Sequence, residues 1–193
     1  MVGPGLQRHV PRVWVGPMAP HISLLAKEAQ RMEEDALFSS RRHFNACGYW
    51  MASHYVLGLP TVVVAALAAT AIGRSNGVAT ILAVCAAVLA AVNTFLNPQQ
   101  RAAAHSSSGN RYNALRNKAR RFRELHCTDS AKGGEELDGE LSALASELDK
   151  LNAESPWTPR WAYRKAKKGI EGGEAAYVAD ESPEGPVSGT NPG

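Results

Sequence analysis

The sequence predicts an all-α membrane protein, in which a two-helix transmembrane hairpin is flanked by cytoplasmic amphipathic and coiled-coil helices. The first observation is a pair of almost purely apolar stretches, residues 55–72 and 78–96, which contain no Asp, Glu, Lys or Arg. As helices of 18 and 19 residues, they extend roughly 27 to 29 Å, about the thickness of a bilayer's hydrocarbon core. The second observation is the short connection 73–77, which requires the two helices to be antiparallel.

The overall composition conceals this hairpin. The chain is 45% hydrophobic and 20% charged, with a mean hydropathy of −0.23, because strongly charged segments flank the apolar stretches. A soluble alternative places the hairpin at the centre of a helical bundle. However, 193 residues with this many charges have little apolar material with which to bury two helices that are apolar all round. We therefore favour the membrane interpretation.

Both ends of the chain are predicted to be disordered, which leaves one domain over residues 23–171. Residues 1–22 are rich in Gly and Pro and contain no apolar run of signal-peptide length. Residues 172–193 are rich in Gly, Pro and acidic side chains.

A cytoplasmic helix is expected over residues 23–47, with Ser23 as its N-cap. It leads into a first transmembrane helix over residues 50–72, within which Pro60 predicts a kink near Val56. A weak heptad pattern runs through the cytoplasmic part, formed by Leu25, Ala29, Met32, Ala36, Ser39, His43, Ala46 and Trp50.

Small residues recur every four positions within the hairpin. The stripes are Thr61, Ala65, Ala69 and Gly73 in the first helix, and Ala79, Ala83, Ala87 and Ala91 in the second, 78–96. Such stripes let helix backbones approach closely in lipid. One stripe is expected to serve the hairpin and another face to serve oligomerisation, although alanine-rich helices also produce this pattern by chance.

The second transmembrane helix also carries candidate pore-lining residues. Thr80, Ala87 and Thr94 lie on one face at heptad spacing, and Asn93 is a polar residue within the apolar stretch. The alternative is that Asn93 and the threonines bond to neighbouring helices or lie at the interface. The first helix has no continuous polar stripe, which argues against a permanently open channel.

Three further helices are expected after the hairpin, over residues 98–126, 135–152 and 158–171. Asn97 caps the first of these and Pro98 occupies its first turn. The second carries a leucine seam at steps of four and three, which predicts helix pairing. Its members are Leu137, Leu141, Leu144, Leu148 and Leu151. Because the first helix is basic, the second acidic and their linker short, they are expected to fold back antiparallel.

The basic residues of helix 98–126 are candidates for contact with lipid headgroups or with the acidic helix. They are Arg111, Arg116, Lys118, Arg120 and Arg121. Polybasic helices near a membrane span commonly face anionic lipid. No nucleic-acid-binding motif accompanies these charges, so nucleic acid is not expected as a partner.

The orientation follows from the distribution of basic residues. Arg31, Arg41 and Arg42 precede the hairpin and a larger group follows it, whereas the connection 73–77 holds only Arg74. The positive-inside rule therefore places both termini in the cytoplasm, with the hairpin crossing the inner (plasma) membrane.

Catalytic and cofactor-binding signatures are missing from the sequence. It contains no GxSxG, HExxH, Walker or GxGxxG motif. The six histidines are scattered, and Cys47, Cys85 and Cys127 form no CxxC pair. We expect no enzyme activity, no cofactor, no metal and no disulfide.

The order of these parts, together with local sequence, resembles the SLATT family, the SMODS- and SLOG-associating two-transmembrane effector domains. The residues that carry the resemblance are Glu28 to Arg31, His43-Phe44, Tyr49-Trp50, Pro60, Asn97-Pro98, Tyr112 to Arg116 with Arg120, and Ala166 to Glu171 followed by Gly173 to Ala175. The resemblance covers residues 24–177.

The resemblance implies a bacterial effector of a nucleotide-linked conflict or antiphage defence system. Such an effector is expected to assemble into a homo-oligomer that permeabilises the membrane. Its trigger would come from a separate nucleotide-producing or nucleotide-sensing protein. The alternative is a non-enzymatic membrane anchor or scaffold that recruits partners through its cytoplasmic helices.

Overall fold

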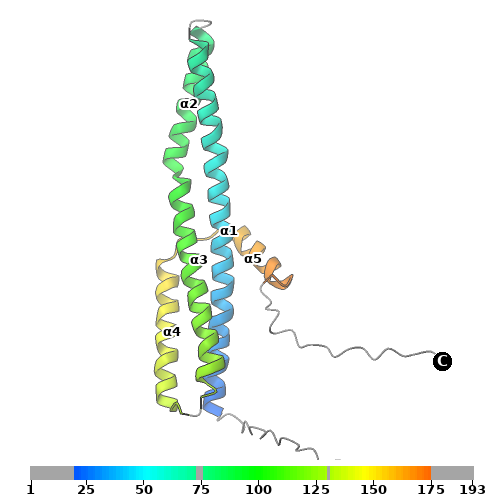
Figure 1. The fold of residues 1–193 in the computed structure, drawn as a ribbon, viewed down its shortest axis with the longest axis vertical. Coiled ribbons are helices and arrows are strands. Elements are labelled where there is room, and N and C mark those ends of the chain that lie inside the picture. Colours follow the sequence, from blue (N-terminus) through cyan, green and yellow to red (C-terminus); the bar gives the residue numbers. More distant parts are fainter. Residues whose placement is uncertain (1–19, 73–75, 130, 175–193) are drawn as a thin grey trace, which may run out of the picture.

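The computed structural model describes residues 20–72, 76–129 and 131–174, and these parts are helical apart from short turns. The elements are α1 (Pro20–Ala71), α2 (Asn76–Leu96), α3 (Pro98–Arg121), the π-helix η1 (Phe122–His126), α4 (Gly134–Glu154) and α5 (Arg160–Glu171). Figure 1 shows a long rod in which α1 runs beside α2 and α3, with α4 beside the end away from the hairpin and α5 beside the middle of the rod. The segments 1–19 and 175–193 of the predicted disordered ends, and residues 73–75 of the connection, lie outside the described residues.

The helices predicted over 23–47 and 50–72 form one continuous helix, α1, of 52 residues. It begins at Pro20 rather than at Ser23, so residues 20–22 are helical and Ser23 is not the N-cap. The Ser23 hydroxyl instead donates a hydrogen bond of 2.7 Å to the carbonyl of Pro20. Gly48 lies in the interior of α1, where one glycine costs only about 1 kcal/mol. The helix is also unbroken through Pro60.

The predicted heptad of α1 is confirmed, since its members from Leu25 to Ala46 are buried. The same spacing continues into the apolar half of α1, where the more buried positions are Leu57, Thr61, Val64 and Ala68. On α2 the matching positions are Ala79, Leu82, Ala86, Leu89 and Asn93. The two apolar helices therefore pack through a heptad seam.

The four-spaced stripes do not close the hairpin, which corrects the packing prediction. Ala65 and Ala69 on α1, and Ala83, Ala87 and Ala91 on α2, are exposed. A step of four residues advances ~40° beyond a full helical turn, so such a stripe soon leaves the contact between two long helices. A heptad drifts by only ~20° per seven residues and stays in the contact.

Asn97 joins α2 to α3 with a left-handed backbone conformation, φ 43°. Pro98 occupies the first turn of α3 as predicted, but the Asn97 side chain does not cap that helix. It bonds to the side chain of Gln100 instead. Asn tolerates the left-handed region better than most residues. One residue thus ends α2, and α3 then continues along α1 (Figure 1).

The leucine seam of α4 packs against α1 and α3 within the same chain. Leu137 joins a cluster with Leu25, Ala29 and Phe122, while Leu151 joins a second cluster with Ala36, Tyr112 and Leu115. Leu141, Leu144 and Leu148 pack against these clusters. The predicted antiparallel pairing of the basic and acidic helices is confirmed (Figure 1). We call this part of the molecule, from α3 to α5 with the N-terminal half of α1, the helical base.

Two helical stretches of the described chain, within Pro20–Ala71 and Gly77–His126, are long and apolar enough to cross a membrane. Only 6% and 0% of the residues in their apolar windows are buried. Large side chains such as Val62, Ile81, Val88 and Phe95 are therefore on the outer surface of the hairpin.

Candidate functional site

The surface of α2 divides into three faces, because successive residues are turned by about 100°. The first is the seam against α1. The second, which we call the small face, is exposed and carries Thr80, Ala83, Ala87, Ala91 and Thr94. The third is exposed and bulky, with Ile81, Val84, Val88 and Phe95. The small face includes three of the predicted pore or packing residues, and the packing within this chain leaves it uncovered.

Asn93 lies apart from this small face, which corrects its grouping with Thr80 and Thr94. It occupies the α1–α2 seam and is half-buried. Its side-chain oxygen is shielded from solvent and has no hydrogen-bond partner among the described residues. An unsatisfied buried oxygen of this kind costs about 1 to 3 kcal/mol. Asn93 thus weakens the hairpin seam.

The threonine hydroxyls are satisfied within their own helices. Thr94 donates to the carbonyl of Ala90 at 2.9 Å, and Thr61 donates to the carbonyl of Leu57 at 2.7 Å. These two hydroxyls can therefore face an apolar environment without an unpaired donor. The remaining candidates on α1, Ala65 and Ala69, are exposed.

Aromatic and basic side chains mark the end of the hairpin next to the base. The Arg101 guanidinium lies 4.8 Å from the ring centre of Trp50 and donates to the carbonyl of Leu96 at 2.8 Å. Beside this pair, the rings of Tyr49 and Trp161 are 5.3 Å apart, which brings α5 to the same level. Aromatic residues of this kind are enriched where a membrane meets water.

A buried polar layer lies below this boundary. The Nδ1 atoms of His43 and His105 are 3.0 Å apart, and the Ser40 hydroxyl donates to the carbonyl of Gly109 at 2.9 Å. Tyr112 stacks on His43 with ring centres 5.5 Å apart, and its hydroxyl donates to Asn152 at 2.9 Å. The layer thus connects α1, α3 and α4.

Burial lowers the pKa of both histidines in this layer. It lowers the pKa of His43 to about 4, with smaller contributions from His105 and Arg42. For His105, burial and then Arg101 lower the pKa. Sequence analysis placed His43 in the α1 heptad, but gave no indication that His105 is its partner.

Three of the five basic candidates of α3, namely Arg111, Lys118 and Arg121, lie beside the acidic helix α4. Arg111 pairs with Glu154 at 2.8 Å and Lys118 pairs with Glu147 at 2.8 Å. Arg121, together with Phe122 and Leu144, lines a groove of about 490 Å³ between α3 and α4. The acidic helix therefore provides the partners of Arg111 and Lys118, which are two of the five basic candidates.

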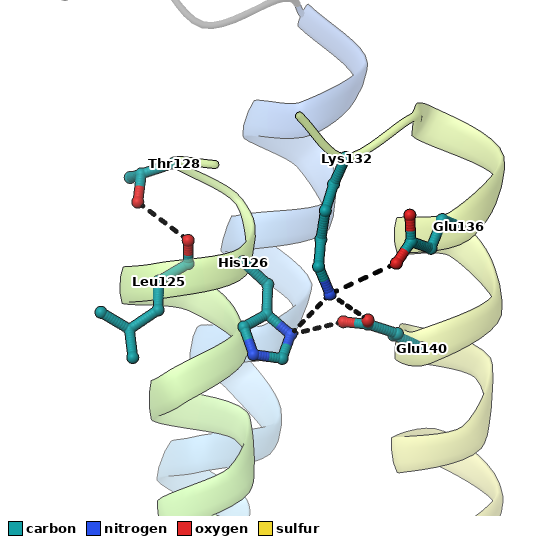
Figure 2. A network of polar contacts seen from close by, with 6 residues as sticks. All are labelled: Leu125, His126, Thr128, Lys132, Glu136 and Glu140. Carbon is teal, nitrogen blue, oxygen red and sulfur yellow. Dashed lines mark hydrogen bonds and ion pairs between the residues drawn. The ribbon is translucent and has the colours of Figure 1, made fainter. Parts of the chain in front are cut away.

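A second polar cluster, not anticipated from the sequence, fastens the turn between η1 and α4 (Figure 2). Glu140 of α4 accepts a hydrogen bond from Lys132 and pairs with His126, and these two partners lower the pKa of its carboxyl. Lys132 also lies 3.5 Å from Glu136. The π-helix supplies His126, and its wider turn is closed by the bond from Cys127 N to Phe122 O at 3.0 Å. The cluster holds α4 in its antiparallel position.

Comparison of the chain with protein-family models, curated proteins and solved structures finds no match.

Proposed function

We infer that the chain is a bacterial two-transmembrane effector of the SLATT type. In this proposal it oligomerises through its hairpin and permeabilises the inner membrane when triggered in a nucleotide-linked conflict or antiphage defence system. The resemblance described above provides the class, and the exposed apolar hairpin is the single observation that carries the membrane part of the proposal.

The exposed side chains of the hairpin argue for a lipid environment. Val62, Leu67, Ile81 and Val88 are each more than half exposed. Leaving a side chain of this size in water rather than in apolar surroundings costs ~1.5 to 3 kcal/mol. A bilayer removes this cost for the whole hairpin at once. By the positive-inside rule, the basic residues on both flanks support a cytoplasmic location for both termini.

The small face of α2 supports assembly through the hairpin. Because Ala83, Ala87 and Ala91 are not used within the chain, they remain available for close approach by a helix of a second copy. The bulky face, with Val88 and Phe95, is then suited to contact lipid acyl chains. The proposal therefore assigns different partners to the two exposed faces.

The arrangement supports a conditional pore over a permanent one. The hydroxyls of Thr61 and Thr94 are bonded within their own helices, so they present no continuous polar path. A path lined by alanine and threonine conducts only when it is wide enough to be wetted. A trigger from a separate nucleotide-producing or nucleotide-sensing protein would act by changing the spacing between copies.

The scaffold alternative has less support. It relies on the leucine seam to recruit partners, but Leu137 and Leu151 are already buried against α1 and α3. The same packing supports a base that is complete within each copy. The proposal assigns no enzymatic activity to the chain.

The experiment that tests this function is membrane-potential imaging of bacteria in which the chain is induced together with its trigger. We expect depolarisation and entry of a small dye. Ala87→Phe, on the small face, should abolish both while the protein stays in the membrane fraction. The matched control Val88→Phe, on the bulky face, should leave both intact. If the membrane potential were retained under every trigger, the pore would be refuted and the membrane scaffold would become the favoured function.

A further inference from the structure

The second basic helix, α5, lies against α1 just below the hairpin. The Asn45 amide donates to the carbonyl of Ala162 at 3.2 Å, and the Trp161 ring contacts that of Tyr49. Ala162 and Ala166 are buried in this contact. Their small side chains bring α5 close to α1 and leave its basic side chains exposed.

The outward side of α5 is cationic and aromatic. Arg160, Arg164, Lys165 and Lys168 are exposed, and none of them forms an ion pair with another described residue. By contrast, Arg111 and Lys118 of α3 are paired with α4. The aromatic side chains next to the α5 cations are exposed as well, at 79% for Trp157, 38% for Trp161 and 47% for Tyr163. This combination is typical of helices that lie at a membrane surface.

A groove of about 560 Å³ runs between α1 and α5. Its lining is Phe44, Asn45, Gly48, Tyr49, Trp161 and Lys165. The groove is open beside Gly48, because a Cβ atom at this position would meet no neighbouring atom within 4 Å. Of these described lining residues, Phe44, Tyr49 and Trp161 are aromatic and Lys165 carries a charge. Such a groove matches a ligand with an apolar body and an anionic phosphate.

The position of the groove indicates where such a ligand comes from. Tyr49 is followed directly by Trp50, which holds Arg101 at the end of the hairpin, and by the exposed apolar residues Met51 and Tyr55. The groove is therefore continuous with the apolar surface of α1. If the hairpin crosses a bilayer, the groove opens at the level of the cytoplasmic headgroups.

We propose that the groove between α1 and α5 binds an anionic phospholipid of the cytoplasmic leaflet. Lys165, with Arg164 and Lys168 on the same helix, would neutralise the headgroup, and Tyr49 and Trp161 would contact the glycerol and upper acyl region. The proposal rests on the membrane insertion proposed above. It assigns headgroup binding to α5, whereas Arg111 and Lys118 of α3 are paired with α4.

The test uses the quenching of tryptophan fluorescence by brominated lipid. Trp161 is kept as the only tryptophan by changing Trp14, Trp50 and Trp157 to Phe. The full chain is reconstituted in bilayers of phosphatidylglycerol and phosphatidylcholine, with bromine on one lipid or the other. We expect an enrichment of phosphatidylglycerol at Trp161 of about fivefold, equivalent to ~1 kcal/mol from a single basic residue near an anionic surface.

The triple variant Arg164→Gln, Lys165→Gln, Lys168→Gln should remove this enrichment. The matched variant Lys118→Gln, Arg121→Gln, on α3, should keep it. In the chain that keeps the natural α5 cations, equal quenching of Trp161 by the two brominated lipids, or no quenching at all, would overturn the proposal. An independent measurement on the natural sequence is native mass spectrometry of retained phosphatidylglycerol, which the triple variant should reduce and the α3 variant should not.

A separate reporter distinguishes failure of the lipid site from failure of membrane insertion. Val88→Trp, in a chain whose four natural tryptophans are Phe, places one tryptophan on the bulky face of α2. Quenching at Val88→Trp without enrichment at Trp161 would reject the lipid site alone. Absence of quenching at both positions would reject insertion and the lipid site together.

Discussion

His43 and His105 face each other across the helical base, with their Nδ1 atoms 3.0 Å apart and both side chains buried. At this distance one nitrogen must donate and the other accept, so the pair contains one hydrogen between the two rings. A second hydrogen there would place two N–H groups head to head. Because α1 supplies one ring and α3 the other, this pair ties the stability of the base to pH.

We predict that the base loses stability as the pH falls from about 6.5 to about 4. The pKa of His43 is lowered to about 4 in the fold, against 6.5 as its ordinary value. Between these values the unfolded chain binds a proton that the folded chain does not, so the free energy of unfolding decreases with falling pH. The full free energy of unfolding is retained above pH 6.5. The contribution of His43 to this loss amounts to ~3 kcal/mol.

Urea titrations of the detergent-solubilised protein at pH 7.5 and pH 4.5 would measure this loss. His43→Leu should flatten the pH dependence, because it removes the titrating ring and leaves His105 without its partner. His21→Gln is the control, since His21 is exposed and pairs only with Asp138 at the surface. If the free energy of unfolding of His43→Leu still depended on pH as strongly as that of the natural chain, the assignment of this dependence to His43 would be contradicted.

Gly109 is predicted to be required for the close contact between α1 and α3. A Cβ atom at this position would lie 2.9 Å from Phe44 Cε1, which is too close for an ordinary contact. The Phe44 ring must shift in Gly109→Ala, and this penalty should cancel the gain of ~1 kcal/mol that alanine otherwise brings to a helix. Adding Phe44→Ala should remove this penalty in a double-mutant cycle. Gly139→Ala, where a Cβ meets nothing, should instead raise the free energy of unfolding. An equal gain in the free energy of unfolding for Gly109→Ala and Gly139→Ala would show that the contact of Gly109 with Phe44 is not close.

The second core cluster is predicted to dominate the stability of the base. Leu115 is fully buried among Ala36, Tyr112 and Leu151. Leu115→Ala should lower the free energy of unfolding by about 2 to 5 kcal/mol in chemical denaturation. Leu125→Ala, at a position that is 61% exposed, should change it by no more than ~0.5 kcal/mol. Similar losses at the two sites would contradict the observed packing.

Asn93 is predicted to favour function at the expense of stability. Asn93→Leu replaces a shielded oxygen that lacks a partner, so the thermal midpoint of the hairpin in detergent should rise, by the equivalent of ~1 kcal/mol. The same change should reduce depolarisation, because a more stable seam resists rearrangement. Thr94→Val, on the small face, should leave the thermal midpoint unchanged. A lower midpoint in Asn93→Leu would mean that the amide has a stabilising partner.

Periodicity explains which packing could be predicted from the sequence. The α1 heptad and the leucine seam of α4 were recognised because charged residues surround the buried positions, which makes the period visible. In the hairpin almost every position is apolar, so hydrophobicity could not distinguish the seam position Ala86 from the exposed Ala87. The four-spaced stripes were chosen by residue size alone and did not predict the packing.

The polar contacts depend on how segments that are distant in the sequence are aligned in the fold. No local sequence pattern indicates this alignment. Neither the pairing of His43 with His105 nor that of Glu140 with His126 could be read from their spacing. Composition likewise could not decide whether the α3 cations contact lipid headgroups or the acidic helix. Only the position of α4 beside α3 shows that Arg111 and Lys118 meet carboxylates.

The central claim is that the hairpin crosses a membrane with the helical base inside the cell. Cysteine labelling with a membrane-impermeant maleimide on spheroplasts tests it most directly, in a chain whose three natural cysteines are changed to Ala. The account predicts that Ser75→Cys, in the connection between the apolar helices, is labelled in intact spheroplasts. Ser142→Cys, at an exposed position of α4, should be labelled only after lysis. Labelling of Ser142→Cys in intact spheroplasts, or protection of Ser75→Cys until lysis, would contradict it.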